Sequence, residues 1–324
     1  MKFFIRFLVF WVMVAACRKE NVPDTHPDYR HEMRRLVQEI SGWSKAIKPD
    51  FAVIPQNGVE LITANGQPDG APVTEYIEAL DGIGQEELFY GYYADDEPTP
   101  PEITRRLSGF LDLAKQYGTT ILVTDYCYTP ARVDSSYMLN RTKGYISFAA
   151  GSRELDRIPA YPDSIFNVNA DNITSLSQAR NFLYLINPDS RFRDKQAFIR
   201  AVQTTDYDLL LTDLFFDGQA FTPSETEALK HKANGGRRLI IAYMSIGEAE
   251  DYRYYWQPGW RPGNPSFIVA ENPDWEGNYI VKYWDPLWKN ILFGNDDSYL
   301  KKILDAGFDG VYLDIIDAYE YFEE

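Results

Sequence analysis

The chain has 324 residues, of which 45% are hydrophobic and 15% aromatic, so it can bury a sizeable core. It carries 48 acidic against 32 basic residues, a net charge of −16, and this acidity disfavours nucleic acid as a partner. Such a surface either serves solubility alone or attracts cationic ligands.

Residues 1–17 have the pattern of a secretory signal peptide. A basic start is followed by an apolar run at 7–14, which is too short to cross a bilayer, and the stretch ends in VAAC at Cys17. A cysteine directly after two alanines resembles a bacterial lipobox, which predicts that Cys17 is lipidated and anchors the protein to a membrane surface. Ordinary signal cleavage, with Cys17 incidental, is the alternative.

Residues 18–29, RKENVPDTHPDY, are polar and contain proline, so they predict a tether. Arg18 and Lys19 favour an exported lipoprotein that faces the periplasm or sits in the outer membrane. Cleavage before Cys17 removes two bases and no acid, so the mature net charge becomes −18.

Residues 30–324 are expected to form a single α/β domain. From Arg30 to Ile47 the apolar residues recur at three- and four-residue steps, which predicts an amphipathic helix. Apolar or β-branched runs predict strands at 51–55, 76–82, 121–126, 182–187, 209–214, 238–245, 278–284 and 309–314. Helical patterns lie at 101–117, 192–203, 223–235 and 288–306, whereas the runs 145–149 and 165–169 fit nothing regular and are expected to be loops.

Strands that alternate with helices in this way predict a (β/α)8 TIM barrel. An open doubly wound sheet is the alternative, but it would need a glycine-rich ligand turn that we do not find. The pattern has a helix before its first strand and none after its last. Because the last strand of a closed barrel lies beside the first, helix 30–47 is expected to cover strand 309–314 with Met33, Leu36, Val37 and Ile40.

The sequence offers little for metal or cofactor chemistry. None of the three histidines, His26, His31 and His231, follows an expected strand, so neither a histidine-rich metal site nor a Ser-His-Asp triad is expected. There is no P-loop, and GIG at 82–84 falls short of a dinucleotide fingerprint. Cys127 has no partner in the chain if Cys17 is lipidated. We expect no cofactor, and the chemistry is left to carboxylates.

Acidic and aromatic residues gather where the expected strands end, which is where barrels keep their active residues. The acids and amides there are Gln56, Asn57, Asp125, Asn187, Asp213, Asp217, Glu248, Glu250, Asp285, Asp314 and Asp317. The aromatic residues include Tyr126, Tyr243, Tyr252, Tyr254, Tyr283, Trp284 and Tyr319, whose flat faces suit sugar rings. Carboxylates with aromatics but without histidine are typical of glycoside hydrolases, although any single acid could instead cap a helix.

Three long segments carry a family resemblance: IAYMSIGEAEDYRYYW (241–256), PDWEGNYIVKYWDPLW (273–288) and GFDGVYLDIIDAYEYF (307–322). Together they resemble the endo-α-1,4-polygalactosaminidase family, glycoside hydrolase family 114, and its bacterial and archaeal branch in particular. PDFAVIPQNGVEL (49–61) and ALDGIGQEELFY (79–90) are also similar to family segments, but in the usual order these two follow the segment at 307–322. The sequence therefore looks like a circular permutant of the family.

The resemblance implies a (β/α)8 barrel that cleaves α-1,4-linked galactosamine polymers through two carboxylates. The family's strand-end aspartate falls on Asp213, in TDLFFD. The second acid is expected after a Trp-x-Gly turn, but here the turn at 275–277 is followed by Asn278, and an amide cannot serve as a general acid. Glu248, Glu250 or Asp314 is left to supply the proton.

We therefore expect Asp213, Glu248 and Asp314 to converge on one cleft, with Asp213 ionised, Glu248 as general acid, and Glu250 and Asp314 in reserve. Substrate contacts are expected from Asn57, Asp125, Tyr243, Glu250, Arg253, Asn278, Tyr283, Trp284 and Asp317. The expected partner is a polysaccharide, and the acidic surface favours a cationic amino-sugar polymer. The alternative is a catalytically inactive glycan-binding lipoprotein on the same barrel.

Overall fold

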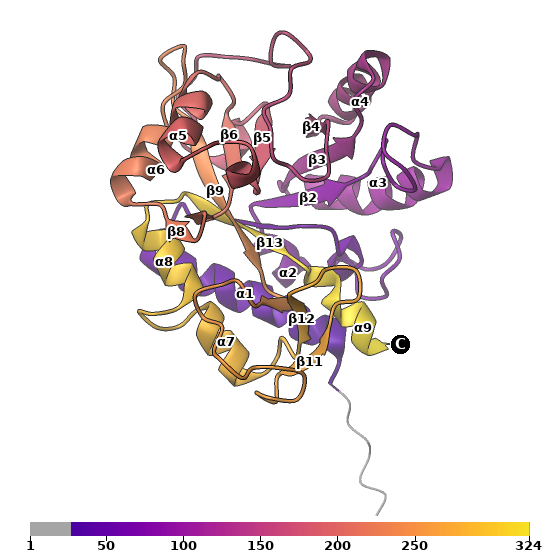
Figure 1. The fold of residues 1–324 in the computed structure, drawn as a ribbon. Coiled ribbons are helices and arrows are strands. Elements are labelled where there is room, and N and C mark those ends of the chain that lie inside the picture. Colours follow the sequence, from indigo (N-terminus) through magenta and orange to yellow (C-terminus); the bar gives the residue numbers. More distant parts are fainter. Residues whose placement is uncertain (1–26, 324) are drawn as a thin grey trace, which may run out of the picture.

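The computed structural model describes residues 27–323 and begins with helix α1 (Tyr29–Ile47) (Figure 1). The expected signal peptide, Cys17 and most of the expected tether lie outside the described residues. The Asp28 side chain caps α1 by accepting a hydrogen bond from the His31 N–H at 2.9 Å. Of the helices within 27–323, none has both the length and the apolar character that crossing a membrane requires.

A five-stranded parallel sheet forms the centre of the molecule, in the order β1 (Ala52–Pro55), β13 (Gly310–Asp314), β9 (Leu239–Ser245), β6 (Leu209–Thr212), β5 (Phe182–Leu185). The expected pairing of the last strand with the first is confirmed, because Ala52 of β1 pairs with Gly310 of β13 in a parallel register. The residues of α1 that were expected to face this pair, Met33, Leu36, Val37 and Ile40, are buried in the same core as the strands.

A second parallel sheet has the order β2 (Gly82–Glu86), β3 (Thr120–Tyr126), β4 (Ile146–Ala150). Two expectations were wrong here. Residues 76–82 form the helix α2 (Thr74–Glu78) and the turn after it, so the strand begins where it was expected to end. Residues 145–149, expected to be loop, belong mostly to β4.

Glycine explains why β2 does not look like a strand. A Cβ atom at Gly84 would lie 1.9 Å from the hydroxyl oxygen of Tyr312 on β13, so the buried tyrosine ring requires glycine at this position. Ile83 is therefore flanked by glycines, and the apolar run that marks the other strands is missing.

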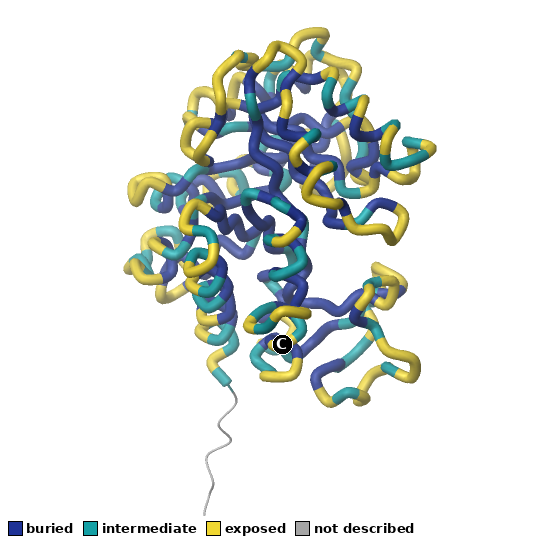
Figure 2. Tube along the Cα trace, turned by 90° about the vertical axis from the view of Figure 1, so that its left-hand side faces the viewer, coloured by how far each residue is buried: buried dark blue, intermediate teal, exposed yellow. Residues whose placement is uncertain are grey.

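The two sheets meet on both sides. A parallel bridge joins Gln56, directly after β1, to Gly84 of β2, and the Asn57 N–H donates to the Gly84 carbonyl at 2.8 Å. On the other side the rings of Phe148 in β4 and Phe182 in β5 lie 5.8 Å apart. Figure 2 shows the strands as a buried interior, with the exposed segments around it.

A third, antiparallel sheet has the order β10 (Glu248–Glu250), β12 (Asn278–Val281), β11 (Ile268–Glu271). The run 278–284 was expected to be a strand of the central sheet, and this was wrong: β12 pairs with β10 and β11 instead. A small hairpin of β7 (Phe215–Phe216) and β8 (Gln219–Ala220) follows β6.

The remaining helices lie between the strands in the sequence, except α9, which follows the last strand. They are α3 (Pro101–Gln116), α4 (Pro130–Lys143), α5 (Lys195–Gln203), α6 (Pro223–Leu229), α7 (Pro286–Leu292), α8 (Tyr299–Asp305) and α9 (Tyr319–Glu323), with 3-10 turns at 59–62, 176–178, 188–190 and 316–318. The helix expected at 288–306 is divided into α7 and α8, and the one expected at 223–235 ends at Leu229. A short helix, α9, does follow β13, and Arg30 of α1 is paired with Glu323 of α9 at 2.9 Å.

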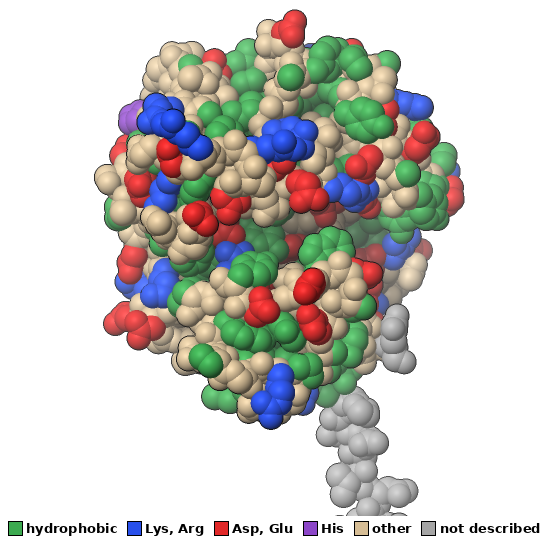
Figure 3. All heavy atoms as spheres, viewed as in Figure 1, with side chains coloured by type: hydrophobic (Ala, Val, Ile, Leu, Met, Phe, Trp, Pro, Cys, Tyr) green, Lys and Arg blue, Asp and Glu red, His purple; other side chains and the backbone are tan. Residues whose placement is uncertain are grey.

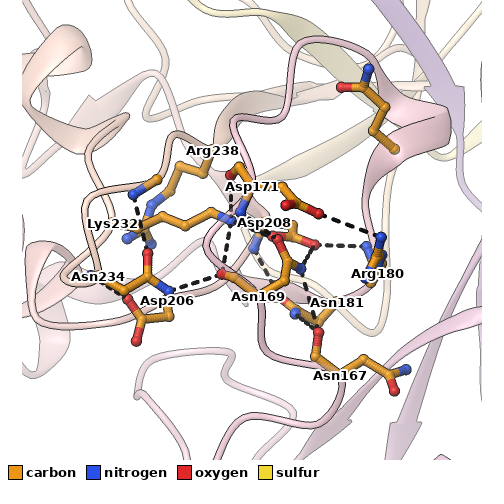
Figure 4. A network of polar contacts seen from close by, with 12 residues as sticks. Asn167, Asn169, Asp171, Arg180, Asn181, Asp206, Asp208, Lys232, Asn234 and Arg238 are labelled. Atoms are coloured by element: carbon orange, nitrogen blue, oxygen red, sulfur yellow. Dashed lines mark hydrogen bonds and ion pairs between the residues drawn. The ribbon is translucent and has the colours of Figure 1, made fainter.

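A buried polar network lies where β6 begins (Figure 4). Lys232 and Asp208 form an ion pair of 2.6 Å in which neither side chain is exposed. The second oxygen of Asp208 accepts hydrogen bonds from the Asn169 side chain and the Arg180 N–H, both at 2.8 Å. This network ties the long connection between β4 and β5 to the N-terminal end of the sheet, the end that serves stability in barrels.

Candidate active site

Two groups of carboxylates lie where strands end, and for all of them but Glu250 the strand is part of a parallel sheet. The first contains Glu86 at the end of β2 and Asp314 at the end of β13, both half-buried. The second contains Asp213, directly after β6, and Glu250 at the end of β10, both buried. Figure 3 shows acidic and hydrophobic side chains around a hollow in the middle of the face that it views.

Glu86 is held by three hydrogen-bond donors. The Gln56 amide and the Tyr126 hydroxyl each donate to its carboxylate, and the Asn57 amide donates at 3.2 Å. Asn57 has a left-handed backbone conformation, with φ of 59°, and its side-chain oxygen accepts the Glu86 N–H at 3.0 Å. These contacts fix the position of the Glu86 carboxylate.

Asp314 is in a contrasting environment. Burial raises the pKa of its carboxyl group to about 7, and the nearby charge of Glu86 adds to the rise. The Tyr243 hydroxyl, which donates to one Asp314 oxygen at 2.7 Å, opposes the rise. Asp314 therefore keeps its proton in part of the molecules near neutral pH, and Glu86, whose charge contributes to this, accepts three side-chain hydrogen bonds.

The backbone after Asp314 is strained. Ile315 has a φ of 58°, which is costly for a β-branched residue. The turn carries Asp317, half-buried in the structure, whose pKa is raised to about 6 by burial and by the charges of Glu320 and Glu86. Strain of this kind concentrates at functional sites, and here it follows the last residue of β13.

The second group of carboxylates lines a cavity of about 640 Å³ and is bridged by one arginine. Arg253 donates to Asp213 at 2.7 Å and to Glu250 at 2.6 and 3.2 Å. Burial raises the pKa of Asp213, while the charge of Arg253 and the Phe215 N–H oppose the rise. The other lining residues include Asn187, Asp189, Asp217, Tyr243, Tyr252, Tyr254, Trp275 and Asn278.

Tyr243 joins the two groups. It lines the cavity and donates through its hydroxyl to Asp314, so Asp314 lies directly behind one wall of the cavity. Exposed aromatic faces are available in the same cavity, because Trp275 is 65% and Tyr252 is 62% exposed. The arrangement can bind a sugar against aromatic faces and present an acid and a carboxylate beside it.

The structure therefore brings together most of the expected site residues. Asp213, Glu250, Arg253, Tyr243 and Asn278 line the cavity. Glu248 does not line it: one of its oxygens accepts the Asn272 amide at 2.7 Å, and the other is buried without a partner among the described residues. Burial raises the pKa of Glu248, the Asn272 amide opposes the rise, and Glu248 is not among the residues that line the cavity.

Asp125, Tyr283 and Trp284 were expected to contact substrate, and the structure corrects the first two. Asp125 is completely buried and accepts four hydrogen bonds, from the N–H groups of Phe89 and Tyr90 and the side chains of Ser136 and Asn140. Tyr283 is also fully buried and donates to the Tyr29 carbonyl at 2.8 Å. Trp284 packs on Tyr29 and Phe322, away from the cavity-lining residues.

Glu86 was missed by the sequence analysis. The strand was expected at 76–82, which placed Glu86 in a loop rather than at a strand end. A sequence signal was present in GIGQEELFY, because this segment puts a carboxylate directly after a glycine-containing stretch. Within residues 27–323, no group of three or more histidine, cysteine, aspartate or glutamate side chains is arranged to hold a metal ion.

One family model matches the C-terminal part of the chain. Residues 174–324 match the model of glycoside-hydrolase family GH114. The GH114 match includes Asp213, Glu250, Arg253 and Asp314. Glu86 and its donors lie outside the matched residues.

Three relatives are similar to parts of the chain, and all three are uncharacterized. The protein MJ1477 of Methanocaldococcus jannaschii is 43% identical over 157 residues, which cover 48% of this chain and 43% of that protein. A protein of Deinococcus radiodurans is 43% identical over 125 residues (39% of this chain, 38% of that one), and one of Thermotoga maritima is 38% identical over 123 residues (38% and 36%). The chain thus matches less than half the length of each of these relatives.

Proposed function

We propose that this protein is a glycoside hydrolase in which Glu86 and Asp314 are the two catalytic carboxyl groups. The observation that carries the proposal is their contrasting environments at the ends of β13 and β2, two strands that flank β1. Asp314 has a pKa of about 7, whereas Glu86 accepts hydrogen bonds from three side chains. A pair of carboxyl groups whose environments separate their protonation states is what general acid and base roles need.

Each residue of the pair has a role that its contacts support. Asp314 protonates the glycosidic oxygen of the leaving sugar. Before this transfer the proton is on the Asp314 oxygen that does not accept the hydrogen bond from Tyr243. The Glu86 carboxylate accepts the proton of the water that attacks the anomeric carbon, and it stabilises the oxocarbenium-like transition state from its hydrogen-bonded position. Tyr243 and Tyr126 are positioning residues, because each orients one carboxyl group through its hydroxyl.

We assign the cavity to binding of the sugar next to the cleaved bond. Asp213, Glu250, Asp189 and Asp217 line it against a single cationic residue, Arg253, so its charge favours a cationic ligand. Trp275 and Tyr252 offer exposed ring faces. This supports a partly deacetylated amino-sugar polymer, and with the family resemblance an α-1,4-linked polymer of galactosamine and N-acetylgalactosamine, as the substrate.

A glycan-binding protein without catalysis is the second candidate. The observation that favours it is Asn278, an amide that lines the cavity where the resemblance leads one to expect an acid. Incubating the protein with partly deacetylated α-1,4-linked galactosamine polymer and measuring new reducing ends separates the two. A hydrolase releases them, whereas a binding protein retards the polymer in a gel but releases none.

We also propose that the two parallel sheets close into one (β/α)8 barrel with a circularly permuted order of elements. The bridge between Gln56 and Gly84 and the contact between Phe148 and Phe182 support closure. In a closed barrel the amides of β4 and β5 should exchange hydrogen as slowly as those of β13. Fast exchange in β4 and β5 alone would indicate open sheet edges.

The circular permutation has a separate test. If the sequence is rewritten with residues 27–173 placed after residue 324, the match to the GH114 model should continue past residue 324 into them.

We propose that the protein is an exported lipoprotein, held at a membrane by acylation of Cys17. The support is the basic start, the short apolar run and the VAAC sequence of residues 1–17. Changing Cys17 to Ala should move the protein from the membrane fraction to the soluble fraction. Retention of the variant in the membrane fraction would count against the anchor.

A further inference from the structure

Exposed tyrosines lie on two loops that follow β2 and β3. Tyr93 is 80% exposed and its neighbour Tyr92 is 42% exposed, both in the loop between β2 and α3. Tyr128, in the loop between β3 and α4, is 60% exposed. The rings of Tyr92 and Tyr93 lie 5.0 Å apart and almost perpendicular to each other, so they present two different faces to solvent.

These loops are held in place by charged side chains. Arg153, from the connection after β4, donates to Glu87, to Asp95 and to the Gly91 carbonyl, each at 2.5 Å. Gly91 has a φ of +112°, and a Cβ atom there would lie 3.0 Å from the Tyr126 Cβ, so the loop packs tightly on β3.

The second loop is tied to the first through one aspartate. Asp96 accepts the N–H groups of Tyr128 and Thr129, both at 2.9 Å. The three tyrosines are therefore presented by a braced surface, and little conformational entropy is lost when a ligand binds to it.

The order of the strands places this surface opposite the cavity. Along the paired strands the order is β6, β9, β13, β1, and the Gln56–Gly84 bridge continues it to β2 and β3. The cavity residues Asp213 and Tyr243 belong to the β6 and β9 side, whereas the tyrosines belong to the β2 and β3 side. Asp314 and Glu86, at the ends of β13 and β2, lie between them in this order.

We propose that Tyr92, Tyr93 and Tyr128 form a second glycan-binding surface, which holds the sugar units on the side of the cleaved bond away from the cavity. This inference rests on the proposed function, because it takes Glu86 and Asp314 as the point of cleavage. The ligand is a polysaccharide chain: the tyrosine faces stack on sugar rings and their hydroxyl groups reach sugar hydroxyls. A chain held on both sides of the catalytic pair is cleaved in its interior.

The test measures binding separately from turnover. In a Glu86→Gln background, the Tyr92→Ala/Tyr93→Ala pair is compared with Tyr92→Phe/Tyr93→Phe by affinity gel electrophoresis and titration calorimetry. The probes are partly deacetylated α-1,4-linked galactosamine polymer, its disaccharide, and chitosan as a second cationic polymer. We expect the Ala pair to raise the Kd for a polymer about tenfold and to leave disaccharide binding unchanged, while the Phe pair keeps the affinity.

Tyr117→Ala is the matched control. Tyr117 is 43% exposed, like Tyr92, but it follows α3 at the opposite end of β3, so its removal should not change polymer binding. If the Ala pair binds the polymer with unchanged affinity, the proposal is overturned. If the Ala pair changes the oligomeric state of the protein without changing the affinity, the tyrosines form a protein interface and the proposal is again overturned. If the Ala pair weakens polymer binding but the wild-type protein releases no reducing ends, the glycan surface stands and the proposed hydrolase fails.

Discussion

Asp314→Asn should lower kcat on the polymer by about a hundredfold to ten-thousandfold, the usual contribution of a general acid. The amide keeps the size of the side chain and can still accept the Tyr243 hydroxyl, but it has no proton to give to the leaving sugar. The wild-type rate should also fall as the pH rises above about 7, because Asp314 then loses its proton. The variant should lack this descending limb of the pH profile.

A substrate with a good leaving group gives the internal control. Cleavage of a dinitrophenyl glycoside needs little help from an acid, so Asp314→Asn should be impaired far less on it than on the polymer. Equal loss on both substrates would contradict the role of Asp314 as the acid.

The same substitution should stabilise the protein at alkaline pH. The pKa of Asp314 is raised from its ordinary value of 3.8 to about 7 in the folded state, so the ionised form disfavours folding. The loss of folding free energy that results from this is absent below about pH 4, grows as the pH rises towards 7, and stays constant above it. Asp314→Asn should therefore melt like the wild-type protein at pH 4 and at a higher temperature at pH 8.

Lys232→Met should destabilise the protein by about 3–5 kcal/mol, the usual cost of removing one partner of a buried ion pair. Neither Lys232 nor Asp208 is exposed, and methionine would leave the Asp208 carboxylate without its counter-charge. The free energy of unfolding, measured by urea denaturation at pH 7, checks this.

Lys301→Met is the matched control for this change. Lys301 forms an ion pair of similar length, 2.7 Å, with Asp305, but the pair lies on the surface of α8. Its loss should cost far less stability than the loss of the buried pair, because water screens the exposed charges. If the two variants were equally stable, the buried network would not hold the connection between β4 and β5.

The elements that the sequence predicted well are those whose patterns are local. Helix α1 and strands β1, β9 and β13 follow from apolar runs, and the pairing of β1 with β13 follows from a helix that precedes the first strand. Strand β2 could not be found in this way, because Gly84 is required by the ring of Tyr312, which is far away in sequence. The run at 278–284 has a strand pattern, but no local signal shows that β12 pairs with β10 and β11.

The candidate site was predicted in part for the same reason. Asp213, Asp314 and Tyr243 follow or end well-marked strands, and the structure places Asp213 and Tyr243 on the cavity. Glu86 was missed with its strand. The sequence could not show whether Glu248 or Glu250 belongs to the cavity. This depends on which of them Arg253 contacts, and that contact forms only in the folded antiparallel sheet.

The most direct test of the catalytic pair compares Glu86→Gln with Glu248→Gln in one assay. Initial rates of reducing-end release are measured on partly deacetylated α-1,4-linked galactosamine polymer, after circular dichroism has shown that both variants are folded. We expect Glu86→Gln to lower the rate at least a thousandfold, because the transition state loses its carboxylate, and Glu248→Gln to stay within a fewfold of wild type. A fully active Glu86→Gln variant, or an inactive Glu248→Gln variant beside it, would contradict the assignment of Glu86 and Asp314.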